Sequence, residues 1–388
     1  MMTNSRSAKF QIQTLTQLVG RITLILLCIL IVGTLILFGM LFAMSPGKPK
    51  PFLDKSGKVI AGSISEKIYV NINGVKQGMF IEGKNKNNPV ILFLHGGPGM
   101  PEYFLAEKYM TALEDNFIVC YWEQRGSGLS YSKNISSNSE TTEQLISDTL
   151  AVTNYLRNRF GQQKIYLMGH SWGSYLGIQV AARAPQLYKA YIGIGQVSQQ
   201  RESEIQAYQF MLGQYKAIGN ECMVKKLEAY PVTESDTALN AYLKSSLRDD
   251  AMHKLGIGTT HNMKSVITGI FLPVMQCRAY TLGEKINIWR GKAFLNSFTD
   301  LCNQMYSTNL TVKVPKLDMP TYFMSGTYDY TVSNTLAESY FEKIQAPIKG
   351  FYLFKDSAHS PMFEEPEKFI RIMQEDVLAG KNNLADAK

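Results

Sequence analysis

The sequence predicts an α/β fold in which a mostly parallel, doubly wound sheet is interrupted by a block of helices. Short apolar runs alternate with helix-like stretches between residues 64 and 197, as in parallel sheets connected by helices. The alternation stops over residues 198–314, where the pattern is helical, and it resumes over residues 315–388. We therefore expect one core in two parts, 64–197 and 315–388, with a helical cap inserted between them.

An apolar stretch from Ile22 to Met44 precedes this core and contains no charged residue. At a rise of 1.5 Å per residue it is long enough to span the roughly 30 Å hydrocarbon core of a bilayer. A cleaved signal peptide is the alternative, but it has a shorter apolar core and small residues at its exit. We expect a tail at 1–21, a single-pass transmembrane helix at 22–44, a linker at 45–63, and a body outside the cytoplasm.

The formal net charge of +8 is concentrated around this apolar stretch. Residues 1–58 hold seven basic residues and one acidic residue, which places most of the excess where it can meet anionic lipid headgroups. The rest of the chain gives no reason to expect nucleic-acid binding. The five cysteines form no C-x-x-C pair and no histidine cluster lies near them, so we expect neither a metal nor another cofactor.

The core elements follow in chain order. Residues 67–82 alternate around Asn73-Gly74, which is typical of a β-hairpin. The continuous apolar runs predict strands buried on both faces, and longer periodic stretches predict helices. Strands are expected at 89–94, 117–122, 165–168, 189–194, 321–324 and 351–354, and helices at 103–113, 141–160, 174–184, 334–344 and 366–378.

The turn after the strand at 165–168 reads Gly169-His170-Ser171-Trp172-Gly173 and leads into a helix. This is the Gly-x-Ser-x-Gly pattern in a strand–turn–helix context, where glycines permit a strained backbone. Ser171 would then lie at a helix N-terminus, whose N–H groups favour developing negative charge. We predict that Ser171 is a nucleophile; an ordinary serine in a glycine-rich turn is the alternative.

A serine hydroxyl needs a neighbouring base, and the chain has five histidines. Among them His359 alone follows a late strand, and we predict it as the base. Asp329 follows the preceding strand and a glycine turn, and we predict it as the acid that orients His359; Asp356 is its rival, expected to cap its own loop. The order nucleophile, acid, base is the one expected on a doubly wound sheet.

A developing oxyanion needs two backbone donors. One is expected to be the N–H of Trp172, directly after the nucleophile. The other is expected from the glycine-rich loop HGGPG at 95–99, at Gly97, because glycine allows the backbone to approach closely.

Four motifs together resemble the proline iminopeptidase group of α/β-hydrolases: HGGPG at 95–99, QRGSGLS at 124–130, GHSWGS at 169–174 and HSP at 359–361. The resemblance covers roughly residues 68–377 and leaves the apolar N-terminal stretch outside it. It implies an α/β-hydrolase core with a helical cap. The activity it implies is release of an N-terminal residue, often proline, from short peptides.

The resemblance also bears on the substrate. Such enzymes have aspartate where this chain has Glu123, a position expected to be structural. They pair the free amine of the substrate with cap carboxylates, because a buried ammonium group must be paired. Glu204 resembles the amine-binding glutamate, although a solvated acidic residue at a helix start is the alternative. Glu284 is a second candidate by elimination.

We therefore expect a membrane-anchored serine peptidase that acts on short peptides through an acyl-enzyme. An esterase or amidase for small or lipid-derived substrates is one alternative, and a non-catalytic binding protein of the same fold is another. Residues 266–275, VITGIFLPVM, are too short to span a bilayer. They predict a packed cap helix bent at Pro273, with pocket lining as the alternative.

Overall fold

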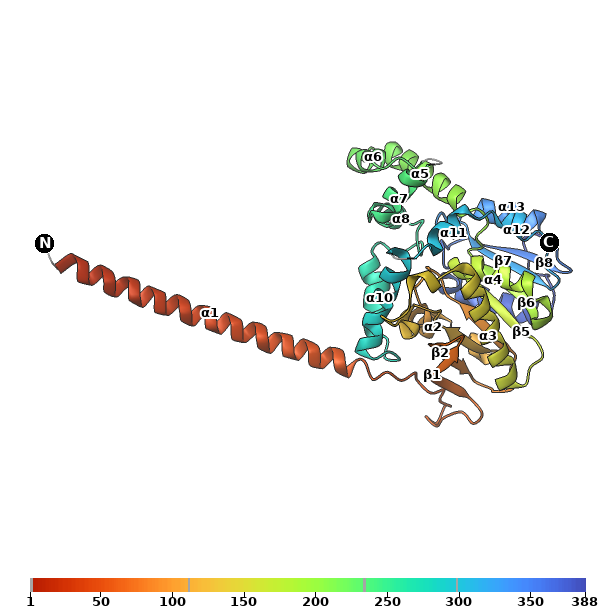
Figure 1. The fold of residues 1–388 in the computed structure, drawn as a ribbon, viewed down its shortest axis with the longest axis horizontal. Coiled ribbons are helices and arrows are strands. Elements are labelled where there is room, and N and C mark those ends of the chain that lie inside the picture. The colour runs from red at the N-terminus through yellow and green to blue at the C-terminus, as the bar shows by residue number, and fades with distance from the viewer. Residues whose placement is uncertain (1–2, 111, 233–234, 298) are drawn as a thin grey trace.

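The computed structural model describes residues 3–110, 112–232, 235–297 and 299–388. Within these residues the core is an eight-stranded sheet with the order β1-β2-β4-β3-β5-β6-β7-β8. β2 pairs antiparallel with both β1 and β4. All the other neighbouring strands, from β4 across the sheet to β8, pair parallel, which confirms the predicted class (Figure 1). The strands are β1 (Ile64–Ile72), β2 (Val75–Gly83), β3 (Val90–Leu94), β4 (Ile118–Trp122), β5 (Ile165–His170), β6 (Tyr188–Ile194), β7 (Thr321–Gly326) and β8 (Lys349–Phe354).

Helices cover both faces of the sheet because the buried strands carry apolar side chains on both sides. Leu92 packs in one cluster with α3 and α4, whereas its neighbours Ile91 and Phe93 pack in the other with α2 and α15. This alternation is the period of two expected for a strand. The helices of the core are α2 (Tyr103–Tyr109), α3 (Thr142–Phe160), α4 (Trp172–Arg183), α13 (Asn334–Lys343), α14 (Pro361–Glu364) and α15 (Pro366–Ile372).

Helices also occupy the stretch between β6 and β7, beyond one end of the sheet (Figure 1). The first four enclose a small apolar core of their own, in which Tyr208, Met211 and Tyr242 are buried. This stretch is the inserted cap. Its helices are α5 (Gln200–Ala217), α6 (Glu221–Glu228), α7 (Asp236–Lys244), α8 (Leu247–Leu255), α9 (Leu272–Gln276), α10 (Leu282–Ser297), α11 (Leu301–Ser307) and α12 (Leu310–Lys313).

A single long helix, α1 (Thr3–Ala43), projects away from the body (Figure 1). It begins earlier than the predicted span and contains it almost completely. Within Thr16–Ala43 the most apolar 18-residue window has a mean hydropathy of 3.0, and none of that window is buried against the protein. It is long and apolar enough to cross a membrane, a test that signal sequences near an N-terminus also pass.

The apolar stretch 266–275 differs from its prediction. It forms a π-helix, Ile267–Phe271, that continues into α9. Ile270 and Val274 are buried, but Ile267, Phe271 and Leu272 are exposed. The prediction of a packed helix is therefore wrong for one of its faces.

Candidate active site

Ser171 lies at the turn between β5 and α4, in a backbone conformation with φ 56° and ψ −120°. The turn can close this tightly because both flanking glycines lack a side chain. A Cβ atom at Gly173 would overlap the carbonyl of Leu94, and one at Gly169 would overlap that of Gly173. Ser171 is partly exposed, whereas the residues on either side of it are buried, so its hydroxyl is accessible at the end of a buried strand.

Asp329 and His359 are joined directly. His359 Nδ1 donates to Asp329 Oδ2 at 2.9 Å, and both side chains are buried. The other carboxylate oxygen, Asp329 Oδ1, accepts from the backbone N–H of Val332 at 2.9 Å, which fixes the orientation of the carboxylate. The partner of His359 is therefore Asp329 and not Asp356, its nearer neighbour in sequence.

The Asp329–His359 pair lies beside the turn that carries Ser171, and Gly195 lies next to both. The N–H of Ser171 donates to the carbonyl of Ile194 at 2.9 Å, which places the turn at the end of β6. A Cβ atom at Gly195 would lie 2.9 Å from His359 Cε1. The structure thus brings Ser171, Asp329 and His359 to one edge of the sheet, while their catalytic roles stay predictions.

The two predicted oxyanion donors are also next to this turn. A Cβ atom at Gly96 would lie 3.3 Å from Ser171 Cβ, and Gly97 follows with φ 123°, a conformation that favours glycine. Among the described residues, the N–H groups of Gly97 and Trp172 have no hydrogen-bond partner. Asn296 of α10 donates to the carbonyl of Pro98 at 2.9 Å and so holds the loop from the cap side.

A second acid–histidine pair, missed by the sequence reasoning, supports the site. Glu102 Oε1 accepts from His170 Nδ1 at 2.7 Å, and Glu102 Oε2 accepts from the N–H of Gly96 at 3.2 Å. His170 Nε2 donates to the carbonyl of His359 at 2.8 Å. Burial alone would lower the pKa of His170, but the Glu102 carboxylate, the His359 carbonyl and the Asp329 carboxylate together raise it. The pair therefore connects the glycine-rich loop to the backbone of the His359 loop.

Gln124 connects three of the sequence motifs. Its Oε1 accepts from Trp172 Nε1 at 2.9 Å, and its Nε2 donates to the carbonyl of His95 at 3.0 Å. Its backbone N–H donates to His95 Nε2, also at 3.0 Å. Burial lowers the pKa of His95 to about 4, so the ring is neutral near pH 7 and can accept this bond. His95 is therefore a support of the loop.

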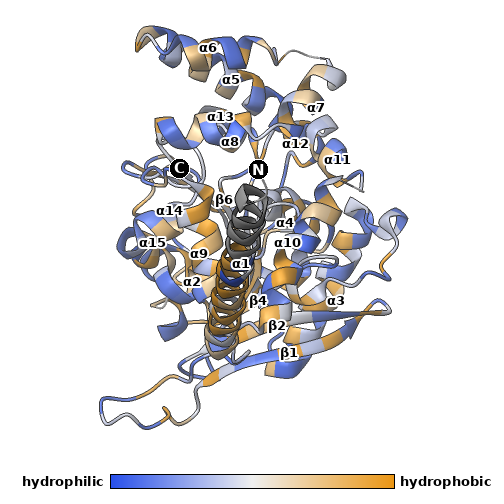
Figure 2. Ribbon diagram, turned by 90° about the vertical axis from the view of Figure 1, so that its left-hand side faces the viewer, coloured by the Kyte–Doolittle hydropathy of each residue, from blue (hydrophilic) through white to orange (hydrophobic). Residues whose placement is uncertain are grey.

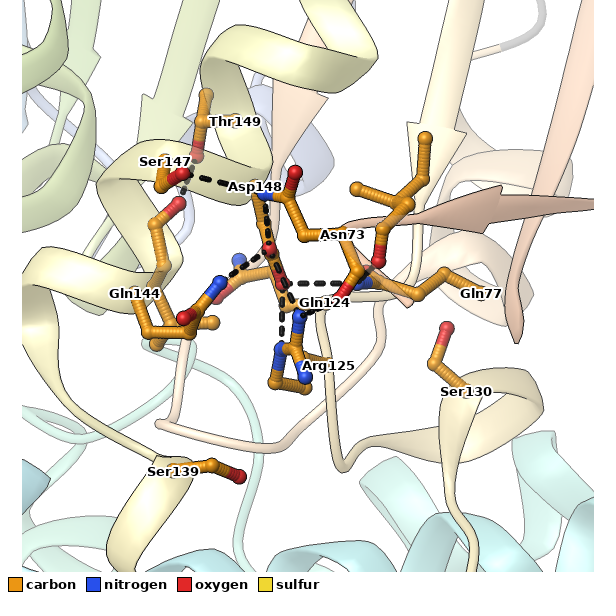
Figure 3. A network of polar contacts seen from close by, with 12 residues as sticks. Asn73, Gln77, Gln124, Arg125, Ser130, Ser139, Gln144, Ser147, Asp148 and Thr149 are labelled. Atoms are coloured by element: carbon orange, nitrogen blue, oxygen red, sulfur yellow. Dashed lines mark hydrogen bonds and ion pairs between the residues drawn. The ribbon is translucent and has the colours of Figure 1, made fainter. Parts of the chain in front are cut away.

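Next to Gln124, Arg125 anchors the same loop to the core (Figure 3). Its guanidinium donates to both carboxylate oxygens of Asp148 on α3, at 2.6 and 2.9 Å. Asp148 also accepts from Asn73 in the β1–β2 turn and from Gln77 on β2. This buried network fixes the loop against α3 and the β1–β2 hairpin. Charges can be buried in this way because they are paired and hydrogen-bonded.

Glu204, the predicted amine-binding residue, is already paired in the structure. Arg248 of α8 donates to both of its oxygens, each at 2.7 Å, and Gln200 donates to Oε1 at 3.1 Å. Gln200 also donates to the carbonyl of Thr331, near Asp329, at 2.8 Å. Glu204 thus lies near the predicted catalytic acid, but its carboxylate is occupied, and its amine-binding role stays a prediction.

Two further glutamates have structural partners. Glu284 accepts from Lys67 Nζ at 2.7 Å and from the hydroxyl of Tyr69 at 2.6 Å, both on β1. Glu123 is buried and accepts from the hydroxyl of Tyr280 and, at 2.5 Å, from the N–H of Leu129. Within the described residues, no group of three or more histidine, cysteine, aspartate or glutamate side chains could hold a metal ion.

The cap contacts the loops that carry Asp329 and His359. The N–H of His359 donates to the carbonyl of Gly258 at 3.3 Å. Nearby, the ring of His261 stacks on Tyr328 with centroids 3.9 Å apart. A cap segment at 256–261 therefore covers the edge of the sheet where Asp329 and His359 lie.

Residues 89–366 match the model of a family described as having the alpha/beta hydrolase fold. A Bacillus subtilis protein named probable aminopeptidase YbaC is 33% identical over 306 residues, covering 77% of this chain and 92% of that protein. The Saccharolobus solfataricus proline iminopeptidase is 25% identical over 305 residues, covering 76% of this chain and 86% of that protein.

A crystal structure of Mycobacterium smegmatis proline iminopeptidase superposes with a TM-score of 0.61 at 17% identity, covering 81% of this chain and all of that one, which shows the shared fold. Together with the turn that carries Ser171 at the end of β5, these matches confirm the resemblance seen in the motifs. The chain belongs to the α/β-hydrolase family and is a hydrolase of the proline iminopeptidase-like type.

Proposed function

We propose that this chain is a serine aminopeptidase that releases an N-terminal residue, proline among them, from short peptides. The observation that carries the proposal is the 2.9 Å hydrogen bond between His359 and Asp329, beside the partly exposed Ser171. The names of the relatives, aminopeptidase and proline iminopeptidase, support the choice of substrate.

The proposed reaction follows from the positions of these groups. Ser171 Oγ attacks the carbonyl carbon of the substrate while His359 Nε2 accepts the serine proton. The N–H groups of Gly97 and Trp172 stabilise the negative oxygen, and the Asp329 carboxylate stabilises the imidazolium. His359 then gives its proton to the leaving amine. Water, deprotonated by His359, attacks the acyl-enzyme and restores Ser171.

A second candidate is an esterase or amidase for substrates without a free amine. The bidentate Arg248–Glu204 pair favours it, because the carboxylate expected to bind an amine is neutralised within the cap. Recognition of an ammonium group by Glu204 would require Arg248 to release it, or a further carboxylate to take part.

The test compares a prolyl chromogenic amide with its N-acetylated twin and with a small ester, using the full-length protein in detergent. Faster cleavage of the free amine, lost in Ser171→Ala, supports the aminopeptidase. Equal cleavage of both compounds, or preference for an ester, supports the second candidate. No hydrolysis of any of them contradicts release of proline, and folded protein that also forms no adduct with a fluorophosphonate indicates a binding protein.

We also propose that α1 anchors the chain in a membrane with the body outside the cytoplasm. The length and hydropathy of Thr16–Ala43 support the anchor, and the side of the membrane is the part that the following test decides. Two exposed cysteines provide the test: Cys28 within α1 and Cys222 on α6 of the cap. In intact cells an impermeant maleimide should label Cys222 and not Cys28. Labelling of Cys28, or no labelling of Cys222 until the cells are opened, would contradict the proposed topology.

A further inference from the structure

Exposed apolar side chains gather on the π-helix Ile267–Phe271 and on α9 and α10. Ile267, Phe271, Leu272 and Ile286 are 63%, 41%, 42% and 44% exposed. The ring of Phe271 also lies against that of Trp289 on α10, with centroids 5.7 Å apart. We call these five residues the cap patch. Exposed apolar surface costs free energy in water, and where it is contiguous it marks contact with a partner or a membrane.

A buried lysine joins the elements of the cap patch to the end of α1. Lys285 of α10 donates to the carbonyl of Met44 at 3.1 Å, to Ser45 Oγ at 2.9 Å and to the carbonyl of Met275 on α9 at 2.7 Å. Because one ammonium group with no exposure reaches all three segments, the end of α1 is fixed against α9 and α10.

The chain after α1 reinforces this junction. The N–H of Gly47 donates to the carbonyl of Arg278 at 3.1 Å, and Pro46 forms a bridge with Thr281. Lys48 and Arg278 are both exposed beside this contact. They would meet headgroups at the level where α1 leaves a bilayer, because basic side chains are attracted to anionic lipid surfaces.

The cap patch belongs to the side of the body from which α1 projects. Figure 1 shows α10 at the edge of the body that faces α1. Figure 2, which looks at that side, shows α9 and α10 flanking α1. A bilayer crossed by α1 would therefore approach these two helices and not the opposite side of the molecule.

We propose that the cap patch is a second membrane contact, inserted into the interfacial layer of the same lipid bilayer that α1 crosses. This inference depends on the anchoring proposed above. The segment Ile267–Gln276 is apolar but short, as is suitable for a helix that lies in the interface and does not span it. Because α10 also holds the loop of Gly97 through Asn296, the contact would place the active-site edge close to the lipid surface.

The tryptophans provide a probe that needs no label. The chain has three: Trp122 and Trp172 are buried in the core, and Trp289 lies in the cap patch. The full-length chain is reconstituted in vesicles of phosphatidylcholine and phosphatidylglycerol, with or without phosphatidylcholine brominated near the headgroup. Bromine quenches indole fluorescence at short range. We expect quenching by the brominated lipid that is lost in Trp289→Phe.

A matched pair of variants tests the surface itself. Phe271→Glu places a charge in the cap patch and should abolish the quenching of Trp289. Val312→Glu places the same charge on α12, at a residue that is 75% exposed, and should leave the quenching unchanged. Equal quenching in both variants would overturn the inference.

Labelling of Cys28 in the same vesicles separates this inference from the anchoring proposal. Cys28 protected from an impermeant maleimide together with quenched Trp289 supports both. Cys28 protected while Trp289 is not quenched overturns the cap patch as a membrane contact and leaves the anchor intact. Cys28 labelled overturns the anchor and, with it, the shared bilayer.

Discussion

Two buried carboxylates, one in the core and one in the cap, have basic partners of different kinds. Asp329 and Glu204 are each about 1% exposed. Asp329 is paired with His359, the histidine that the proposed reaction uses as its base. Glu204 is paired with Arg248, which stays protonated and binds in a rigid bidentate geometry.

The difference shows how two similar-looking acidic residues can differ in function. Within the part of the chain that the structure describes, Nε2 of His359 has no hydrogen-bond partner, so the Asp329–His359 pair is suited to the proton transfer proposed beside Ser171. The Glu204–Arg248 pair joins α5 to α8, and both carboxylate oxygens of Glu204 accept hydrogen bonds from the guanidinium. We therefore expect substitutions in the core pair to change the reaction, and substitutions in the cap pair to change stability.

The largest effect is expected from Asp329→Asn. The asparagine keeps an oxygen for the Val332 N–H but favours the wrong tautomer of His359. We expect kcat/KM to fall roughly 10⁴-fold, as in related triads, with little change in melting temperature. Steady-state kinetics on the prolyl amide checks this; a loss under tenfold would show that Asp329 is not the orienting acid.

Glu204→Gln should show the opposite behaviour. Removing one partner of a buried ion pair leaves Arg248 uncompensated and should lower the free energy of unfolding by about 3–5 kcal/mol. Glu143→Gln is the matched control, because Glu143 forms a bidentate pair with Arg183 in which both side chains are about half exposed. The control should lose about 1 kcal/mol or less.

Urea unfolding of both variants measures this difference. A stable Glu204→Gln protein whose KM rises for the free-amine substrate and not for its acetylated twin would contradict the structural role. It would identify Glu204 as the amine ligand.

Glu102→Gln tests the pair that connects the two loops. It weakens the bond to His170 and the bond from the Gly96 N–H, each a bond to a charged group worth about 1.5–3 kcal/mol. If half of one such bond, about 0.75–1.5 kcal/mol, is expressed in the transition state, kcat falls roughly 4- to 13-fold. KM should change little, since neither residue is expected to contact the substrate. A changed KM with unchanged kcat would rule out this positioning role.

A further effect concerns pH. Burial raises the pKa of Glu123 from its ordinary 4.5 to about 8, although hydrogen bonds from Tyr280 and Leu129 oppose the rise. Between these values the unfolded chain releases the proton that the folded chain retains, so this contribution to stability is present at pH 4.5 and is lost as the pH rises to 8.

Melting temperatures between pH 5 and pH 8 check the contribution of Glu123. The decrease over this range should be smaller in Glu123→Gln than in the original protein. Parallel curves for the two proteins would show that Glu123 does not carry the titration.

The fold and the location of the three predicted catalytic residues in it were predictable, because both depend on local patterns. Short apolar runs that alternate with helix-like stretches predict a parallel sheet. A parallel sheet places the loops that follow its strands at one edge. Ser171, Asp329 and His359 each follow a strand; the Gly-x-Ser-x-Gly motif selected Ser171, and position after the late strands selected the other two. The hairpin was also predictable, because Asn73 and Gly74 both adopt positive φ, as a tight two-residue turn requires.

Partners distant in sequence could not be predicted in this way. Arg248 is 44 residues from Glu204, and Glu102 is 68 residues from His170. No periodicity in the chain indicates that these side chains meet. The exposed face of 266–275 was also missed, because an apolar sequence does not show which of its sides the fold will cover.

The most direct test of Ser171 as an activated nucleophile is mass spectrometry of the intact protein after reaction with a fluorophosphonate. We expect one adduct, located on the peptide that contains Ser171, and loss of the reaction in His359→Ala. Folded protein that forms no adduct, or an adduct on a residue other than Ser171, would contradict the proposed mechanism.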